Sequence, residues 1–177
     1  MSVIWMQWIG SGSVVAGTAS LGSRLAARYR DRPRELRELT TVLRALAAEI
    51  TYARTPLVQA LTRAGSSVPR PGVIRQFAQG AASDLKLPGA VLEVVWRTRV
   101  TQELAESSLT NEDLEIVNGL ARTIGQTGVE EQTGALMAAI ALLLDREREA
   151  TAERSQYARL YVTLGVLAGV LIVVLLW

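Results

Sequence analysis

Two carboxylates, Glu112 and Glu115, are the residues of this 177-residue chain whose type and spacing come closest to acid–base chemistry. A buried carboxylate pair could exchange protons with a substrate. Thr110, however, stands three residues before Asp113, which is the spacing of a helix capping box. The pair is therefore expected on the exposed first turn of a helix, and we predict that neither glutamate is catalytic.

The residue types that most enzymes use are missing from the sequence. It has no cysteine, which excludes disulfides, thiol nucleophiles and thiolate metal sites, and no histidine, the commonest general base and metal ligand. The 17 acidic side chains are dispersed among 19 basic ones, without a basic stripe interleaved with aromatic rings. We therefore predict a protein that is not an enzyme and that binds no metal, no cofactor and no nucleic acid.

Arginine is concentrated in one short segment near the N-terminus. Its planar guanidinium binds carboxylates through two hydrogen bonds, so this segment could meet an acidic partner. Because the segment directly follows an uncharged stretch, its arginines could also contact lipid headgroups, at ~1 kcal/mol each near an anionic membrane. The lipid role is favoured and the partner role stays open for Arg28, Arg30, Arg32, Arg34 and Arg37.

The end of the chain predicts a membrane-spanning helix. Residues 160–177 carry no charged side chain. With a rise of ~1.5 Å per residue, they would form a helix roughly 27 Å long, close to the thickness of the hydrocarbon core of a bilayer. Tyr161 and Trp177 occupy the two ends, where aromatic rings favour the membrane surface. A hydrophobic helix that joins subunits of a soluble complex is the alternative.

A second uncharged stretch, residues 3–23, predicts another transmembrane helix, although it is rich in glycine, serine and threonine. A signal peptide would carry positive charge before the apolar run, whereas here the arginines follow it. Basic residues also precede the C-terminal stretch and none follows it, so the positive-inside rule places both termini outside and residues 24–159 in the cytoplasm. The prediction is a cell-membrane protein with two spans.

The segment between the spans predicts an all-α fold, an antiparallel bundle of about six cytosolic helices in one domain. Apolar residues recur at three- and four-residue spacing, and all five prolines fall at expected helix starts or breaks. The helices are expected at residues 33–53, 56–64, 73–82, 89–106, 111–124 and 129–159. The last should continue into the second span, and its apolar residues 136–144 should face the core.

A set of motifs in fixed order gives the chain a resemblance to a known family. They are Arg32-Pro33-Arg34, Glu49-Ile50 with Tyr52, Thr55-Pro56-Leu57, Gly125 followed by Gln132, and Leu164-Gly165 with Gly169. Together they extend over most of the chain, which resembles the stage III sporulation protein AB family. The resemblance implies an endospore-forming bacterium, a channel between mother cell and forespore, and a bundle similar to the cytoplasmic domains of type II secretion and type IV pilus platform proteins.

The resemblance also implies partners. They are a secretion-type ATPase similar to stage III sporulation protein AA, in the mother-cell cytosol, and other membrane subunits of the channel. Under this interpretation the protein is a membrane-anchored assembly subunit and a platform for the ATPase. The alternatives are a membrane scaffold that acts through its spans without touching the ATPase, an uncharacterised membrane enzyme, and a small transporter subunit.

The far end of the first long helix is the candidate partner interface, because a cytosolic ATPase could reach it there. Its residues are Glu49, Tyr52, Thr55, Pro56 and Leu57. The alternative interpretation is that Thr55 and Pro56 only cap a helix and that Tyr52 is half-buried packing.

Small residues inside the predicted spans are candidates for helix packing in the membrane, since they let backbones approach closely. One ridge is Gly12, Ala16 and Ser20, and the other is Gly165 and Gly169. Glycine is frequent in membrane spans in any case, so this interpretation and a passive one have equal weight.

Overall fold

The computed structural model describes the backbone of residues 29–176 and the side chains of residues 29–155. Over this range the regular elements are helices, and no strand is present. They are a helix at residues 29–48, the π-helical turn η1 (Glu49–Ala53), α2 (Leu57–Ser66), α3 (Val73–Asp84), α4 (Leu92–Glu103), the 3-10 turn η2 (Leu104–Glu106), α5 (Asn111–Gly119), the 3-10 turn η3 (Leu120–Arg122) and α6 (Val129–Leu176). The predicted all-α class with about six helices is confirmed.

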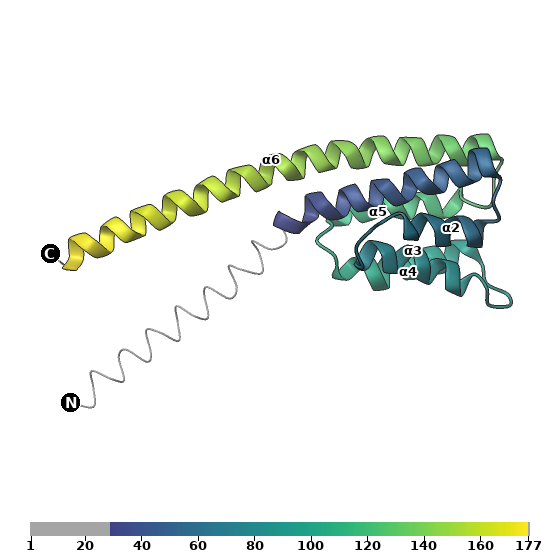
Figure 1. Cartoon of the computed structure of the whole chain (residues 1–177), viewed down its shortest axis with the longest axis horizontal. Coiled ribbons are helices and arrows are strands. Elements are labelled where there is room, and N and C mark those ends of the chain that lie inside the picture. The colour runs from purple at the N-terminus through teal and green to yellow at the C-terminus, as the bar shows by residue number, and fades with distance from the viewer. Residues whose placement is uncertain (1–28, 177) are drawn as a thin grey trace, which may run out of the picture.

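The helices run up and down between two ends of the bundle, and α6 extends well beyond the others (Figure 1). Contacts between the 29–48 helix and α6 define their antiparallel register. Arg32 contacts Glu153, Arg37 contacts Glu147, and in the following π-helical turn Thr51 contacts Thr133. The first helix therefore finishes beside the start of α6. We call this end, formed by residues 49–57, 85–91 and 123–132, the tip.

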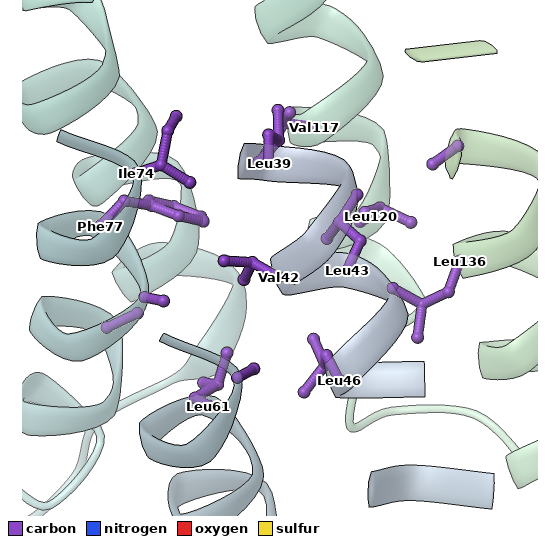
Figure 2. Packing of buried hydrophobic residues seen from close by; sticks show 14 of the residues in the cluster. Leu39, Val42, Leu43, Leu46, Leu61, Ile74, Phe77, Val117, Leu120 and Leu136 are labelled. Carbon is purple, nitrogen blue, oxygen red and sulfur yellow. The ribbon is translucent and has the colours of Figure 1, made fainter. Parts of the chain in front are cut away.

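The 29–48 helix lies at the centre of the hydrophobic core. Leucines at three- and four-residue spacing cover its inner faces, and Leu36, Leu39 and Leu43 are fully buried, as the spacing predicts. In Figure 2, side chains of α2 and α3 lie on one side of this helix, and side chains of α5, η3 and α6 lie on the other. Because both sides of one helix are covered, the core is continuous from α2 to α6.

Three sequence-based expectations about the helices were wrong. Gly65 does not follow α2 but lies buried inside it, where a Cβ atom would be 3.1 Å from the Cβ of Ala78, so the glycine allows α2 and α3 to pack closely. The first helix was expected at residues 33–53, but it is described from residue 29, and residues 49–53 form the π-helical turn, in which Ala53 is exposed. The 136–144 run is apolar on both sides of α6, and Met137 and Leu142 face outward.

The predicted spans fall mostly beyond what the structure describes. Residues 3–23 lie outside the described residues. The backbone of α6 stays helical through Leu176, which includes nearly all of the predicted second span, but its side chains from residue 156 on are not described. Within the described part of the chain, no helix combines the length and the apolar character needed to cross a membrane.

Candidate functional site

The residues predicted as a partner interface come together at the tip. Tyr52 is 87% exposed, which excludes the alternative that it is half-buried packing. The carboxylate of Glu49 accepts hydrogen bonds from the Thr55 hydroxyl and from Arg63, which lower its pKa below the ordinary value. Pro56 is the residue that precedes α2, so the helix begins one residue later than the sequence indicated. Thr55 thus stabilises the turn through Glu49 rather than as an N-cap.

The backbone of the tip departs from regular geometry in two consecutive places. The 29–48 helix widens into the π-helical turn η1, and Arg54 then adopts a left-handed conformation with a φ of 47°. The amides of Arg54 and Thr55 both donate to the carbonyl of Glu49, which closes the turn. A non-glycine residue in this region is uncommon, and π-helical turns and backbone strain both concentrate at functional sites.

A hollow of about 410 Å³ opens beside this turn, and we call it the tip hollow. Three segments of the chain meet there: the turn at residues 49–57, the loop at residues 123–128 and the first turn of α6. The side-chain amide of Gln132 donates to the carbonyl of Thr127, 2.6 Å away, and thereby holds the loop against α6. The hollow is lined by Ile50, Arg54, Thr55, Leu57, Gly125, Val129 and Gln132.

Gly125 keeps the tip hollow open, and its replacement by alanine should be destabilising. Its φ is +74°, and a Cβ atom would lie 2.9 Å from Leu92 Cδ2 and 3.1 Å from Leu57 Cδ2. We expect Gly125→Ala to lower the free energy of unfolding by about 1–2 kcal/mol, because a left-handed conformation costs that much for a residue with a side chain. Urea unfolding measures the change. Gly134→Ala, with open space around it inside α6, is the control and should be neutral or stabilising.

The arginine-rich segment does not form an unpaired basic patch in the described residues. Arg34 pairs with Glu38 at 2.8 Å, and Arg37 pairs with Glu147 at 2.6 Å. Arg30 contacts the neighbouring Asp31, while Arg28 lies outside the described residues. Exposed pairs of this kind are weak and exchange easily, so lipid or partner contacts of these arginines stay predictions.

Arg32 has a different environment, because it is held inside the bundle at the end opposite the tip. Its Nε and Nη2 donate to the two oxygens of Asp113 at 2.9 and 3.1 Å, and its Nη1 donates to Glu153 at 3.2 Å. Asp113 is fully buried. We call Arg32, Thr110, Asp113 and Glu153 the Arg32 cluster; it joins the first helix, α5 and α6.

The predicted capping box explains how Asp113 reaches this position. The Thr110 hydroxyl accepts from the Asp113 amide, and the Asp113 carboxylate accepts from the Thr110 amide at 2.9 Å. The predicted capping box is therefore confirmed. Asp113 also has a second role, as the partner of Arg32, which was not predicted. The available signal was an aspartate where Glu or Gln is usual, since the shorter side chain stays close to the helix start and can meet a guanidinium there.

The Arg32 cluster makes the stability of the fold dependent on acid. Burial raises the pKa of Asp113, but hydrogen bonds from Arg32 and Thr110 outweigh it and bring the pKa below the ordinary 3.8. A carboxyl with a lowered pKa stabilises the folded state above its unfolded pKa and loses this effect as the pH falls through the folded value. Asp113→Asn should therefore be less stable than the natural protein at neutral pH, and the difference should shrink below pH 3.8. Thermal unfolding midpoints of both proteins across pH 2–7 would measure this; a constant difference would contradict it.

Comparison with known proteins shows what kind of protein carries this geometry. Residues 7–177 match the family described as stage III sporulation protein AB. The chain belongs to this family. Stage III sporulation protein AB of Bacillus subtilis (strain 168) is 25% identical over 171 residues, which make up 97% of this chain and 99% of the relative. The family predicted from the resemblance is confirmed.

A solved structure of stage III sporulation protein AB shares the fold. Its TM-score with this chain is 0.65 at 22% sequence identity, over 71% of this chain and 98% of the solved one. At this identity the likeness shows the fold alone.

Other predicted sites of this stage III sporulation protein AB family member lie apart from the tip. Glu112 and Glu115 are exposed, and Glu112 pairs with Arg146 at 2.8 Å, so they do not form a buried acid–base pair. Among the described residues, no group of acidic side chains is arranged to hold a metal ion. Gly12, Ala16 and Ser20 lie outside the described residues. Gly165 and Gly169 belong to α6, and their helix packing stays a prediction.

Proposed function

We propose that the protein is a membrane-anchored structural subunit of the sporulation channel between mother cell and forespore, and that its tip is the platform for a secretion-type ATPase. In this proposal residues 3–23 and 160–177 cross the membrane, both termini lie outside, and the bundle lies in the mother-cell cytosol. The protein performs no bond chemistry. It holds the ATPase in register or passes its movement to the membrane.

One observation carries the platform proposal. The tip hollow is lined by Val129 and Gln132, which belong to the first turn of α6, and α6 continues as a single helix to Leu176. An α-helix rises ~1.5 Å per residue and has no flexible joint unless its hydrogen bonds are interrupted. A partner bound at the tip would therefore act directly on the helix that is proposed to enter the membrane.

The surface of the tip is also suited to protein contact. Besides Tyr52, it exposes apolar side chains at the α3–α4 connection, and the adjoining first turn of α4 exposes another. Leu87 is 63% exposed, and Val91 and Val94 are exposed as well. Leu87, Val91 and Val94 line one surface hollow, and exposed apolar groups that are contiguous mark interaction sites more often than isolated ones do. This supports a partner at the tip, and the sporulation family supports its identity as a channel component.

Binding of the organism's secretion-type ATPase tests the proposal. The full-length protein would be placed in lipid nanodiscs and titrated with the ATPase by calorimetry, without nucleotide, with ADP and with ATP. A charge-matched helical bundle anchored in the same nanodiscs is the control. We expect binding that changes with the nucleotide. The absence of binding in all three conditions would contradict the platform role.

A scaffold that acts without the ATPase is the second candidate, and one observation favours it. Met137 and Leu142 are exposed on the outer side of α6, away from the core. A helix that is apolar on both sides is usually covered on both sides. Other membrane subunits of the channel could cover this side. Loss of channel assembly in Met137→Glu cells, with ATPase binding intact, would assign this surface to subunit contact.

A further inference from the structure

We propose that the tip hollow binds a short partner segment in which an acidic side chain lies directly beside a large apolar one. The identity of the partner as the ATPase rests on the proposed function. The chemistry of the segment follows from the residues that line the hollow, which include one arginine without an ion pair, Arg54, and several apolar side chains.

Arg54 supplies the charge for this recognition. Most arginines described in the structure pair with a carboxylate, among them Arg63 at the tip itself, which contacts Glu49 at 3.0 Å. Arg54 is exposed, lines the hollow, and forms no ion pair with any described residue. Its left-handed backbone, held by the amide contact to Glu49, fixes where its side chain leaves the turn. An unpaired, exposed guanidinium can bind a carboxylate through two parallel hydrogen bonds.

The apolar side chains that line the hollow supply the second half of this recognition. Ile50, Leu57 and Val129 line the hollow, and Gly125 leaves it open because no side chain projects from that position. Its volume of about 410 Å³ lies within the range of natural ligand pockets. A leucine- or phenylalanine-sized side chain entering it would be removed from water, and such buried anchors dominate the energy of many interfaces.

The charge of the hollow favours an acidic segment over a basic segment or a wholly apolar helix. A basic segment would be repelled by Arg54, and a wholly apolar helix would bury the guanidinium without a partner, which is costly. Glu49 does not pair with Arg54; its Oε2 accepts hydrogen bonds from Thr55 and Arg63. Glu130 and Glu131 are exposed but do not line the hollow. Arg54 is therefore the one charged side chain among the residues that line the hollow.

The test uses the full-length protein in nanodiscs and the ATPase, with Arg54→Glu against Arg44→Glu. Both arginines are exposed and without an ion-pair partner among the described residues, and Arg44 lies on the 29–48 helix outside the hollow, so the two variants change the net charge equally. Arg54→Lys keeps the charge but not the paired hydrogen bonds. Tiled 15-residue peptides of the ATPase, screened against the natural protein, identify the segment that binds. Unfolding curves establish that each variant is folded.

The binding measurements decide the matter as follows. We expect Arg54→Glu to weaken ATPase binding by about tenfold or more, Arg54→Lys to have an intermediate effect, and Arg44→Glu to change it little. Binding peptides should contain Asp or Glu next to Leu, Ile, Met or Phe. Equal binding by Arg54→Glu and the natural protein, or binding peptides that are basic, would overturn the inference and leave the platform role standing. No binding by the natural protein would overturn both.

Discussion

Replacement of Arg32 by alanine is expected to lower the free energy of unfolding by about 3–5 kcal/mol, because it leaves a buried carboxylate without its counter-charge. Asp113 is fully buried and receives two hydrogen bonds from the Arg32 guanidinium. Removing one partner of such a pair lowers the free energy of unfolding by far more than the intact pair contributes to it. The remaining charge is then buried away from water and has no counter-charge. The loss would also release the first helix from α5 and α6 at the end opposite the tip.

Urea unfolding of the full-length protein in mild detergent, followed by circular dichroism, measures this loss. Arg34→Ala is the matched control, because Arg34 is two positions away and its pair with Glu38 is partly exposed. Exposed pairs contribute ~0–1 kcal/mol, so the control should change stability little. Similar losses for the two variants would show that the Arg32 cluster does not hold the bundle together.

A double variant separates the ion pair from simple loss of packing. Arg32→Met with Asp113→Asn leaves no buried charge, while the amide oxygen of the introduced asparagine can still accept from the Thr110 amide that Asp113 now caps. We expect the double variant to be more stable than the losses of the Arg32→Met and Asp113→Asn single variants predict, by roughly 0.5–3 kcal/mol, because residues in direct contact are coupled. Additive losses would indicate that Arg32 acts through its packing alone.

Replacement of Trp96 by alanine is expected to have an effect of similar size, a loss of about 3–5 kcal/mol. The side chain is 1% exposed, and its ring meets that of Phe77 edge-to-face, with the centroids 5.0 Å apart. Its Nε1 donates to the carbonyl of Val117 at 2.9 Å and so joins α4 to α5. Alanine would leave a cavity between α3, α4 and α5 and would break this link.

Two further variants are needed. The first separates the contribution of the Trp96 hydrogen bond from that of its ring, and the second is the control. Trp96→Phe keeps an aromatic ring but loses the donor. The Val117 carbonyl still accepts from the Leu120 amide, so the lost hydrogen bond should cost only about 1 kcal/mol. The smaller ring also leaves a small cavity, and the total loss should stay below that of Trp96→Ala. Tyr52→Ala removes an exposed ring at the tip and should change stability by less than ~0.5 kcal/mol. A large loss for Tyr52→Ala would mean that this ring serves the fold instead of a partner.

The helical fold was predictable because its signals are local. Leu36, Leu39 and Leu43 share one side of a helix by spacing alone, and all are buried. The prolines divided the chain into helices close to those observed, since proline is tolerated near the start of a helix but disrupts its interior. Pro33 is the exception, because it lies inside a helix that is already described from residue 29. The run at 136–144 was less informative: its residues are apolar without a period, so the sequence could not indicate that Met137 and Leu142 face outward.

The candidate site was only partly predictable, because its decisive features depend on tertiary contacts. Glu49 and Tyr52 were placed at the end of the first long helix, and they lie there. The left-handed Arg54 had no signature, since nothing in its residue type favours a positive φ. The pair of Arg32 with Asp113 joins residues 81 positions apart, and only the packing of α5 against the first helix brings them together.

Cysteine labelling of the tip tests most directly the central claim that the ATPase sits there. The chain contains no cysteine, so single replacements of Tyr52, Thr55 and Lys86 report on the tip, and one of Ala105, in η2 at the opposite end, is the control. Maleimide labelling rates would be compared in nanodiscs with and without the ATPase. We predict slower labelling at the three tip positions and an unchanged rate at position 105. Equal rates at every position with bound ATPase, or protection at position 105 alone, would contradict the claim.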